Sequence, residues 1–165
     1  MEVKFEEVSY AYTDKTSNQS NILNNVNLSF KEGKITSLIG KSGSGKTTLA
    51  ELSNALILPT DGKVNIGKYL VTKVGTEKDC NINTIRINVG LVFQFPEEQF
   101  FNMTIRDEVS FGMKFFNYRM SEMEKRTLDA LRMVGLDEEY LDRNPFTLSN
   151  GEKRKVAIAS ILVFN

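Results

Sequence analysis

The sequence predicts an α/β fold, and three features carry this prediction. Apolar and polar residues alternate at residues 3–8 and 26–30, as in strands with one solvent-facing side. A glycine-rich loop then stands between an apolar segment at residues 35–39 and a helical segment at residues 46–56. From about residue 104 the apolar spacing is mainly helical. The chain thus begins with strands, continues with a strand–loop–helix unit and ends with helices. This order is typical of an α/β domain with a helical insertion.

The composition is that of a folded domain without a strong electrostatic bias. The chain has 165 residues, 41% of them hydrophobic, so it can form a domain with a sizeable core. Its 21 basic and 21 acidic residues balance, so no overall basic field favours nucleic acid. Histidine is absent, which excludes imidazole bases and ligands, and Cys80 has no partner for an internal disulfide. The charged N-terminus and the lack of a long apolar run predict a cytoplasmic protein.

The first half of the chain is expected to hold several strands and one helix. In chain order these are strands at 3–12, 26–30 and 35–39, a helix at 46–56 and a strand at 63–66. The third strand is expected to be the most buried. A polar stretch at residues 13–21 predicts a surface loop, and Pro59-Thr60-Asp61-Gly62 predicts the turn that ends the helix. Residues 67–83 carry no pattern that assigns them.

The second half is expected to be mainly helical. A strand at residues 89–94 stops at Phe95-Pro96, and helical spacing covers residues 104–117. Ser121 and Glu124 have the spacing of a capping box, so a helix should begin there, run through Val134 and end at Gly135. Asn144-Pro145 breaks the chain before a last apolar helix, whose apolar face is expected to lack cover.

The glycine-rich loop has the residues of a phosphate-binding loop. Residues 40–47, GKSGSGKT, fit the pattern G-x-x-x-x-G-K-[ST] in the expected place between strand and helix. Glycines let successive N–H groups point at one anion, and the helix N-terminus adds its dipole. Lys46 can reach the β- and γ-phosphates, Thr47 is placed for Mg²⁺, and Thr48 for the α-phosphate. The strand–helix context disfavours a Gly/Ser hairpin with an incidental lysine. The predicted nucleoside triphosphate site is Gly40, Lys41, Ser42, Gly43, Ser44, Gly45, Lys46, Thr47 and Thr48.

Further motifs resemble those of ATP-binding-cassette (ABC) ATPases. Residues 147–152, TLSNGE, look like the family's signature motif, usually written L-S-G-G-Q. Gln94, at the end of a predicted strand, resembles the family's glutamine loop. Tyr12 stands where the family places an aromatic that stacks on adenine, and residues 58–62 look like its turn after the first helix. The resemblance covers the whole chain, with the motifs in the family's order.

The resemblance implies a role for each motif. It makes ATP and Mg²⁺ the cofactors, Lys46 and Gln94 the catalytic residues, and Thr47 and Gln94 the metal contacts. The basic residues 153–155 are expected to form a solvated turn, with contact to nucleotide or partner as the alternative. The signature residues, which would grip the γ-phosphate held by a second subunit, are Ser149, Asn150, Gly151 and Glu152.

Plainer alternatives stay open for these residues. Tyr12 could be an ordinary strand-end tyrosine, and Gln94 could simply cap a strand. Ser149 and Glu152 could form only an N-terminal capping box, although such a helix start is itself an anion site. Two residues depart from the usual signature. Asn150 replaces its first glycine, which is tolerable because asparagine accepts the left-handed region. Glu152 replaces its glutamine and would bring a carboxylate near a phosphate.

Within the family, the segments FQFPEEQFF at 93–101 and DEVSFG at 107–112 are similar to energy-coupling-factor (ECF) transporter ATPases. Those proteins drive import of vitamins and metal ions. The resemblance implies two partners, a second ABC ATPase subunit and an integral membrane subunit, and no nucleic acid. It also implies a peripheral place on the cytoplasmic face of the membrane. The alternatives are an ATPase of another ABC transporter class and a non-catalytic nucleotide-binding fragment. A P-loop kinase would leave the signature unexplained.

The resemblance further implies that the chain is the N-terminal part of an ABC domain. In the family, the signature helix leads into the Walker B strand, with a magnesium-binding aspartate and a catalytic glutamate, and then to a switch histidine. The expected fold is therefore a P-loop NTPase of the ABC type, with an antiparallel β subdomain and a helical subdomain, cut before that strand. The expected divisions are the ATP-binding core at 1–95, the glutamine loop and helical subdomain at 96–150, and the signature helix at 151–165. The chain alone is expected to be inactive and unstable as a monomer.

Overall fold

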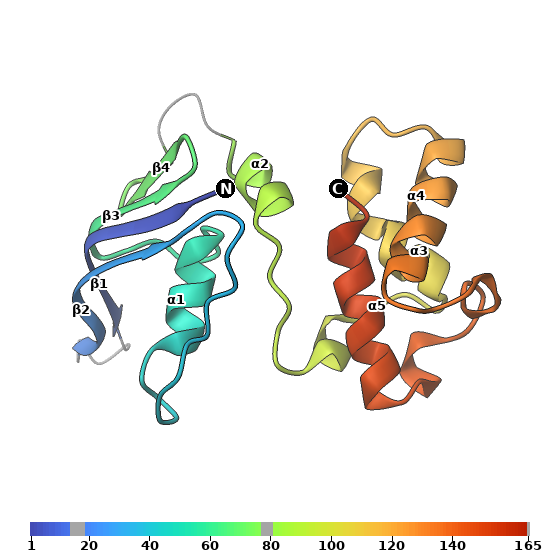
Figure 1. Ribbon diagram of the computed structural model, residues 1–165, viewed down its shortest axis with the longest axis horizontal. Coiled ribbons are helices and arrows are strands. Elements are labelled where there is room, and N and C mark those ends of the chain that lie inside the picture. Colours follow the sequence, from blue (N-terminus) through green and yellow to red (C-terminus); the bar gives the residue numbers. More distant parts are fainter. Residues whose placement is uncertain (14–18, 77–80, 165) are drawn as a thin grey trace. The chain divides into compact units, whose positions relative to one another are not determined.

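A computed structural model describes residues 1–13, 19–76 and 81–164 of the chain (Figure 1). Cys80 lies outside the described residues. The chain divides into two compact units, Met1–Leu91 and Val92–Asn165. The first is an antiparallel sheet with helices and the second is helical, so both expected subdomains are present. The finer division at residues 95 and 150 stays a prediction.

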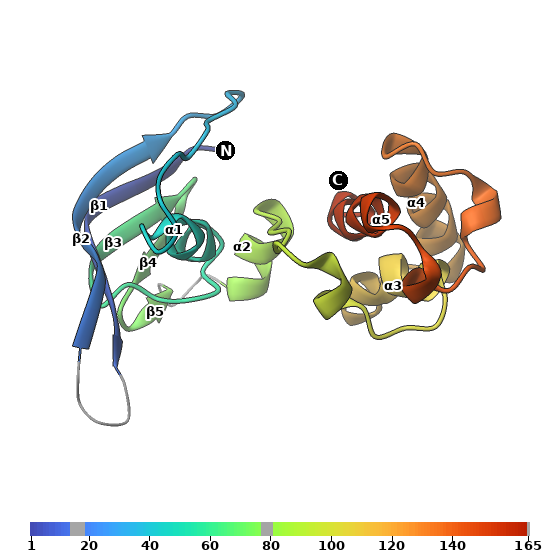
Figure 2. The same cartoon turned by 90° about the horizontal axis from the view of Figure 1, so that it is seen from below.

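The sheet of the first unit has five antiparallel strands in the order β2-β1-β3-β4-β5. In chain order they are β1 (Val3–Thr13), β2 (Gln19–Phe30), β3 (Asp61–Ile66), β4 (Tyr69–Thr72) and β5 (Gly75–Thr76). Val3 and Phe5 of β1 face the core, but the next buried residue is Val8, which breaks the two-residue alternation. A bulge between Phe5 and Val8, with Glu7 at φ 53°, restores it. Helix α1 (Lys46–Ser53) lies on one face of the curved sheet, where Leu52 joins the core (Figure 2).

Two predictions for the first unit are corrected by the structure, and one unassigned stretch is resolved. The expected buried strand at residues 35–39 is wrong: the segment is irregular, and Ile35 and Ile39 are 100% and 94% exposed. A strand needs a hydrogen-bonding neighbour, and none of the described strands offers one to this segment. Helix α1 ends at Ser53 rather than near residue 56, because Ala55 turns left-handed at φ 54°. The unassigned residues 67–83 contain β4, β5 and the start of α2 (Ile82–Asn88).

The second unit packs three helices around one apolar core. They are α3 (Ile105–Ser110), α4 (Met120–Met133) and α5 (Asn150–Leu162). Short 3-10 turns occupy Pro96–Gln99, Phe111–Phe115, Glu138–Tyr140 and Pro145–Thr147. The core includes Ile105, Val109, Met113, Leu131, Leu136 and Val156. The expectation that the last helix lacks cover is wrong, because α5 buries Val156, Ala157 and Ala159 against α3 and α4.

Predictions of helix limits in the second unit were partly right. The helical stretch 104–117 is α3 followed by the 3-10 turn Phe111–Phe115, and Thr104 caps α3 by accepting from the Asp107 N–H. The capping box at Ser121 is wrong, because α4 begins one residue earlier, at Met120, without a side-chain cap. The helix ends at Met133, one residue before the predicted Val134, and Gly135 follows it with the expected left-handed backbone at φ 70°. The expected strand at residues 89–94 is irregular.

Candidate functional site

The phosphate loop ends where α1 begins. Gly43 and Gly45 have φ values of 78° and 85°, a region that favours glycine. A Cβ on Gly45 would lie 2.7 Å from Leu23 Cδ2 of β2, so the loop approaches the sheet more closely than any side chain would permit. The glycine pattern therefore meets two separate requirements: a left-handed backbone and close packing against the sheet.

Lys46 spans the loop from the first residue of α1. Its ammonium donates to the carbonyl oxygens of Gly40 at 2.9 Å and Lys41 at 2.7 Å, and to Ser44 Oγ at 3.3 Å. These contacts place a positive charge at the centre of the curled backbone. That is where a lysine of this motif has to be to contact the outer phosphates of a nucleotide.

The donors at this helix start fit a polyphosphate. The first helical bond of α1 runs from the Leu49 N–H to Gly45 O at 2.9 Å, so the three preceding amide groups are left for another acceptor. For a metal ion the loop supplies the exposed Thr47 hydroxyl, and the described residues contain no cluster of three carboxylate, thiol or imidazole groups. Mg²⁺ commonly takes few protein oxygens together with phosphate oxygens and water. The loop therefore fits Mg²⁺ brought in with a nucleotide rather than a metal held alone.

Tyr12 lies near the end of β1 with half of its surface exposed. Tyr10, two residues earlier on the same face of the strand, meets it edge to face with the ring centroids 5.0 Å apart. Burial raises the pKa of Tyr10, which leaves it a neutral support for its neighbour. Tyr12 thus contacts Tyr10 on one part of its ring and keeps half of its surface open, on which a flat base could stack.

Gln94 lies in the irregular segment that begins the second unit. Its carbonyl oxygen accepts a hydrogen bond from Arg154 Nη2 of α5 at 3.3 Å. Lys155 Nζ donates to Gly135 O at 3.3 Å, so residues 154 and 155 of the basic turn bind backbone carbonyls. Sequence reasoning missed the Arg154 contact, since the two residues are 60 positions apart and no local pattern links them.

The signature residues form the start of α5. Ser149 Oγ accepts from the Glu152 N–H, and Glu152 Oε2 accepts from the Ser149 N–H at 2.9 Å, which is a complete capping box. Asn150 is already helical and has no positive φ, so the left-handed argument for tolerating it is not needed. The amide groups of Asn150 and Gly151 have no acceptor among the described residues. The helix start therefore keeps two backbone donors available to an anion.

The Ser149 hydroxyl also donates to Glu152 Oε2, at 2.6 Å, and the carboxylate has a further donor that the sequence did not reveal. Tyr140 Oη donates to its second oxygen, Oε1, at 2.9 Å. The hydrogen bonds from Ser149, followed by that from Tyr140, lower the pKa of Glu152 from its ordinary 4.5 to about 2. The same contact raises the pKa of Tyr140. Any stability that Glu152 contributes through its lowered pKa is therefore complete above its ordinary pKa and is lost as the pH falls towards 2.

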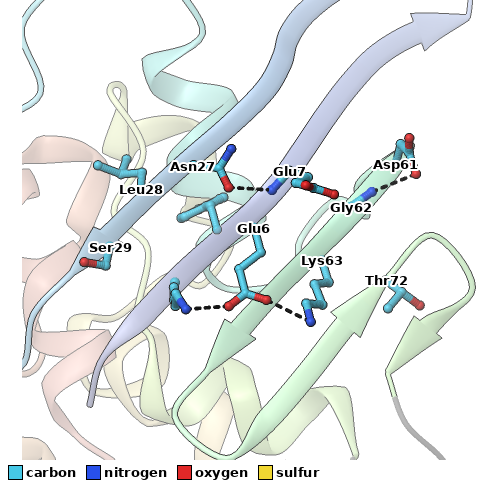
Figure 3. Close-up of a pocket in the computed structure, with 11 residues that line it drawn as sticks. Glu6, Glu7, Asn27, Leu28, Ser29, Asp61, Gly62, Lys63 and Thr72 are labelled. Carbon is cyan, nitrogen blue, oxygen red and sulfur yellow. Dashed lines mark hydrogen bonds and ion pairs between the residues drawn. The ribbon is translucent and has the colours of Figure 1, made fainter.

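A groove of about 910 Å³ on the solvent-facing side of the sheet lies apart from these residues (Figure 3). Its centre is the Glu6 carboxylate, which bridges Lys4 on its own strand and Lys63, its direct partner on β3. Hydrogen bonds from the two lysines lower the pKa of Glu6 to about 2. None of the predicted nucleotide-binding residues lines this groove, and both of its lysines are paired with Glu6. The candidate site is therefore placed at the sequence motifs and not at this groove.

The predicted site residues are divided between the two units. Tyr12 and the phosphate loop, residues 40–48, belong to the first unit, and Gln94 and the signature residues 149–152 belong to the second. The roles predicted for these residues stay predictions.

Comparison with known proteins places these motifs in a family. The chain is 41% identical over 162 residues to the energy-coupling factor transporter ATP-binding protein EcfA2 of Enterococcus faecalis, covering 98% of this chain and 55% of that protein. A structure of CbiO1 from Clostridium perfringens, described as part of the ABC transporter complex CbiONQ, is 31% identical with a TM-score of 0.77. That match covers 98% of this chain and 61% of CbiO1.

A second solved structure is the ATP-binding cassette MJ0796, a dimer in a post-hydrolysis state bound to ADP and Pi. It is 31% identical with a TM-score of 0.80, and the match covers 99% of this chain and 70% of that one. The chain thus spans about 55% of the length of the curated relative and a larger share of the solved cassettes. The family model for ABC transporters matches residues 23–165, and the chain therefore belongs to the ABC transporter family.

Proposed function

We propose that this chain supplies the ATP-binding part of an ECF-type ABC importer, in which ATP binding and hydrolysis drive uptake of a vitamin or metal ion. The observation that carries the proposal is the Lys46 ammonium, held by the carbonyls of Gly40 and Lys41 at the start of α1. The similarity to an energy-coupling factor ATP-binding protein over 98% of the chain supports the transporter class.

The residues take distinct parts in this proposal. The loop amides and Lys46 bind the phosphates, and Tyr12 stacks on the adenine. Thr47 and Gln94 would hold Mg²⁺, which would supply positive charge to the phosphate oxygens. Residues 149–152 bind the γ-phosphate held by a second ATPase subunit. The dimeric state described for MJ0796 supports the partner arrangement.

The second proposed partner is a membrane subunit that contacts residues 95–101. Phe95 and Phe101 are 51% and 58% exposed, and Glu98 is exposed beside them. An apolar and acidic surface of this kind is unusual for a segment that only meets water. The side chains of Pro96 and Glu97 lie outside the described residues. No described helix has the length and apolarity needed to cross a bilayer. From the similarity to an energy-coupling factor ATP-binding protein, we propose a peripheral place on the cytoplasmic face of the membrane.

Charge reversal of the acidic pair tests this coupling surface. In the full-length transporter, Glu97→Lys with Glu98→Lys is expected to reduce ATP-driven uptake more than basal ATP hydrolysis, because the change disrupts docking and spares the phosphate loop. A matched control is Glu124→Lys with Asp129→Lys on α4, which changes the charge equally at another site. Equal losses of uptake and hydrolysis would count against a coupling surface.

Substitution of Tyr12 tests adenine stacking. Base–aromatic stacking is worth about 1–3 kcal/mol, so Tyr12→Ala is expected to weaken ATP binding by the full-length protein roughly tenfold. Tyr12→Phe keeps the ring and is expected to bind ATP nearly as well as the wild type. Isothermal titration with ATP separates the two variants. If they lost the same affinity, stacking would be the wrong explanation.

The transport function itself is tested in vesicles that hold the complete transporter encoded by the source genome. A panel of radiolabelled vitamins and divalent metal ions is offered with ATP on the cytoplasmic side. We expect ATP-dependent uptake of one of them, lost with Lys46→Ala. The proposal would be contradicted if no compound in the panel were taken up in an ATP-dependent way.

A further inference from the structure

We propose that Glu108 is a positioning residue that fixes the end of the coupling segment, residues 95–101, for contact with the membrane subunit. This inference rests on the proposed function and deepens it, because it names the side chain that gives the end of this segment its shape. Glu108 is buried, so it acts on the partner through Phe101 and not by a contact of its own.

The Glu108 carboxylate binds the chain just ahead of its own helix, α3. Its Oε2 accepts hydrogen bonds from the Phe101 N–H at 3.1 Å, the Asn102 N–H at 2.8 Å and Asn102 Nδ2 at 3.0 Å. Phe101 and Asn102 belong to no helix or strand, so no regular backbone ladder satisfies their amide groups. Glu108 supplies the acceptor and thereby fixes the direction of two consecutive peptide groups.

These contacts explain why an acid stands at this position. Glu108 is 7% exposed, and a buried carboxylate costs free energy unless hydrogen bonds satisfy it. Among the described residues, its hydrogen-bond donors are those of Phe101 and Asn102. An apolar side chain would be the usual choice for a buried position that only has to pack. The acid therefore serves the shape of residues 101 and 102.

The helix that carries Glu108 is itself anchored in the second unit. Thr104 Oγ1 accepts from the Asp107 N–H at 3.1 Å and caps the start of α3. Ile105 and Val109 of the same helix are fully buried in the core. The three hydrogen bonds of Glu108 thus tie the end of the coupling segment to a helix that the core holds.

Phe101 is presented at the surface by this arrangement. Its side chain is 58% exposed, and its ring meets Phe111 edge to face with the centroids 4.5 Å apart. Phe111 meets Phe115 in the same way at 5.2 Å. Glu108 therefore fixes the backbone of Phe101, and Phe111 supports its ring. An apolar side chain that is held in one orientation before a partner arrives loses less freedom on binding.

The test compares uptake with ATP hydrolysis by the full-length transporter in vesicles, at equal amounts of assembled complex. We expect Glu108→Ala to lower the uptake per ATP hydrolysed about tenfold, the equivalent of one hydrogen bond to a charged group, with hydrolysis changed less than about twofold. Glu108→Gln keeps one carbonyl acceptor and should lower the same ratio about threefold. In a Phe101→Ala background, Glu108→Ala should lower the ratio no further, since Glu108 acts through Phe101.

Val109→Ala is the matched control for loss of stability. Val109 is the next residue of α3 and is fully buried, so alanine there weakens the packing of the helix. It leaves Glu108 and its three donors in place. We expect the uptake per ATP hydrolysed to stay within about twofold of the wild type.

The variants separate a positioning role from a merely structural one. An unchanged ratio in Glu108→Ala, or an equal loss in Val109→Ala, would overturn the inference. A full further loss in the Phe101→Ala background would overturn it as well, because Glu108 would then act elsewhere. If Glu108→Ala did not assemble, the ratio in Glu108→Gln would decide, and a wild-type value there would overturn the inference. ATP-dependent uptake by the wild type that Lys46→Ala abolishes upholds the proposed function in each case, and its absence would refute both.

Discussion

Lys46→Ala is expected to reduce ATP hydrolysis by the full-length protein at least about 100-fold, the size of effect seen when a preorganised charge or donor is removed from a reacting site. The ammonium is fixed by Gly40 O, Lys41 O and Ser44 Oγ in the middle of the loop. Among the described residues, no other cationic side chain donates a hydrogen bond to the carbonyls of Gly40 and Lys41. Alanine therefore removes both the charge and the contacts that order the loop. Phosphate release by the purified protein measures the loss.

The matched control is Lys34→Ala, an exposed lysine of the same unit outside the phosphate loop. It removes the same charge and is expected to leave turnover within about twofold of the wild type, as for surface substitutions away from special features. If both variants lost turnover equally, the loss would come from the lower net positive charge of the protein and not from the position of Lys46. If neither lost it, the phosphate loop would not be the site of the chemistry.

Glu108→Ala is expected to lower the free energy of unfolding by about 3 kcal/mol, because three part-buried donors lose a charged acceptor. A donor left without its acceptor costs about 1–3 kcal/mol when buried, and water recovers part of this here. Glu108 is 7% exposed, and its Oε2 accepts from the Phe101 N–H, the Asn102 N–H and Asn102 Nδ2 at 3.1, 2.8 and 3.0 Å. The carboxylate thus organises the end of the proposed coupling segment.

Urea denaturation of the full-length protein, followed by circular dichroism, measures this loss. Glu108→Gln keeps one carbonyl acceptor and should fall between alanine and the wild type. The exposed Glu124→Ala on α4 is the control and should change stability by less than about 0.5 kcal/mol. An alanine effect at position 108 no larger than at 124 would show that the three hydrogen bonds contribute nothing.

Features set by short stretches of sequence were predicted, and features that join distant residues were not. The curled backbone of the glycine-rich loop was predicted because Gly43 and Gly45 favour positive φ values by themselves. The Ser149–Glu152 capping box was predicted because its partners are three residues apart. The contacts of Tyr140 with Glu152 and of Arg154 with Gln94 depend on how the second unit folds, so no pattern signals them.

The wrong predictions have the same physical origin. Apolar character at residues 35–39 predicted a strand, but a strand forms only beside another strand, and a single segment does not specify its neighbour. Ser121 and Glu124 have capping-box spacing, yet the helix begins at Met120, so the serine falls inside it. In α5 the apolar residues predicted a helix correctly, but not that α3 and α4 cover it.

The central claim is that residues 40–48 bind the phosphates of ATP, and equilibrium binding tests it most directly. Isothermal titration of the full-length protein with ATP and Mg²⁺ should give saturable binding. Affinity should fall at least about tenfold in Lys46→Ala, as expected when a charge-assisted contact to phosphate is lost, and should be unchanged in Lys34→Ala. Equal affinity in the wild type and in Lys46→Ala, or no binding by the wild type, would contradict the claim.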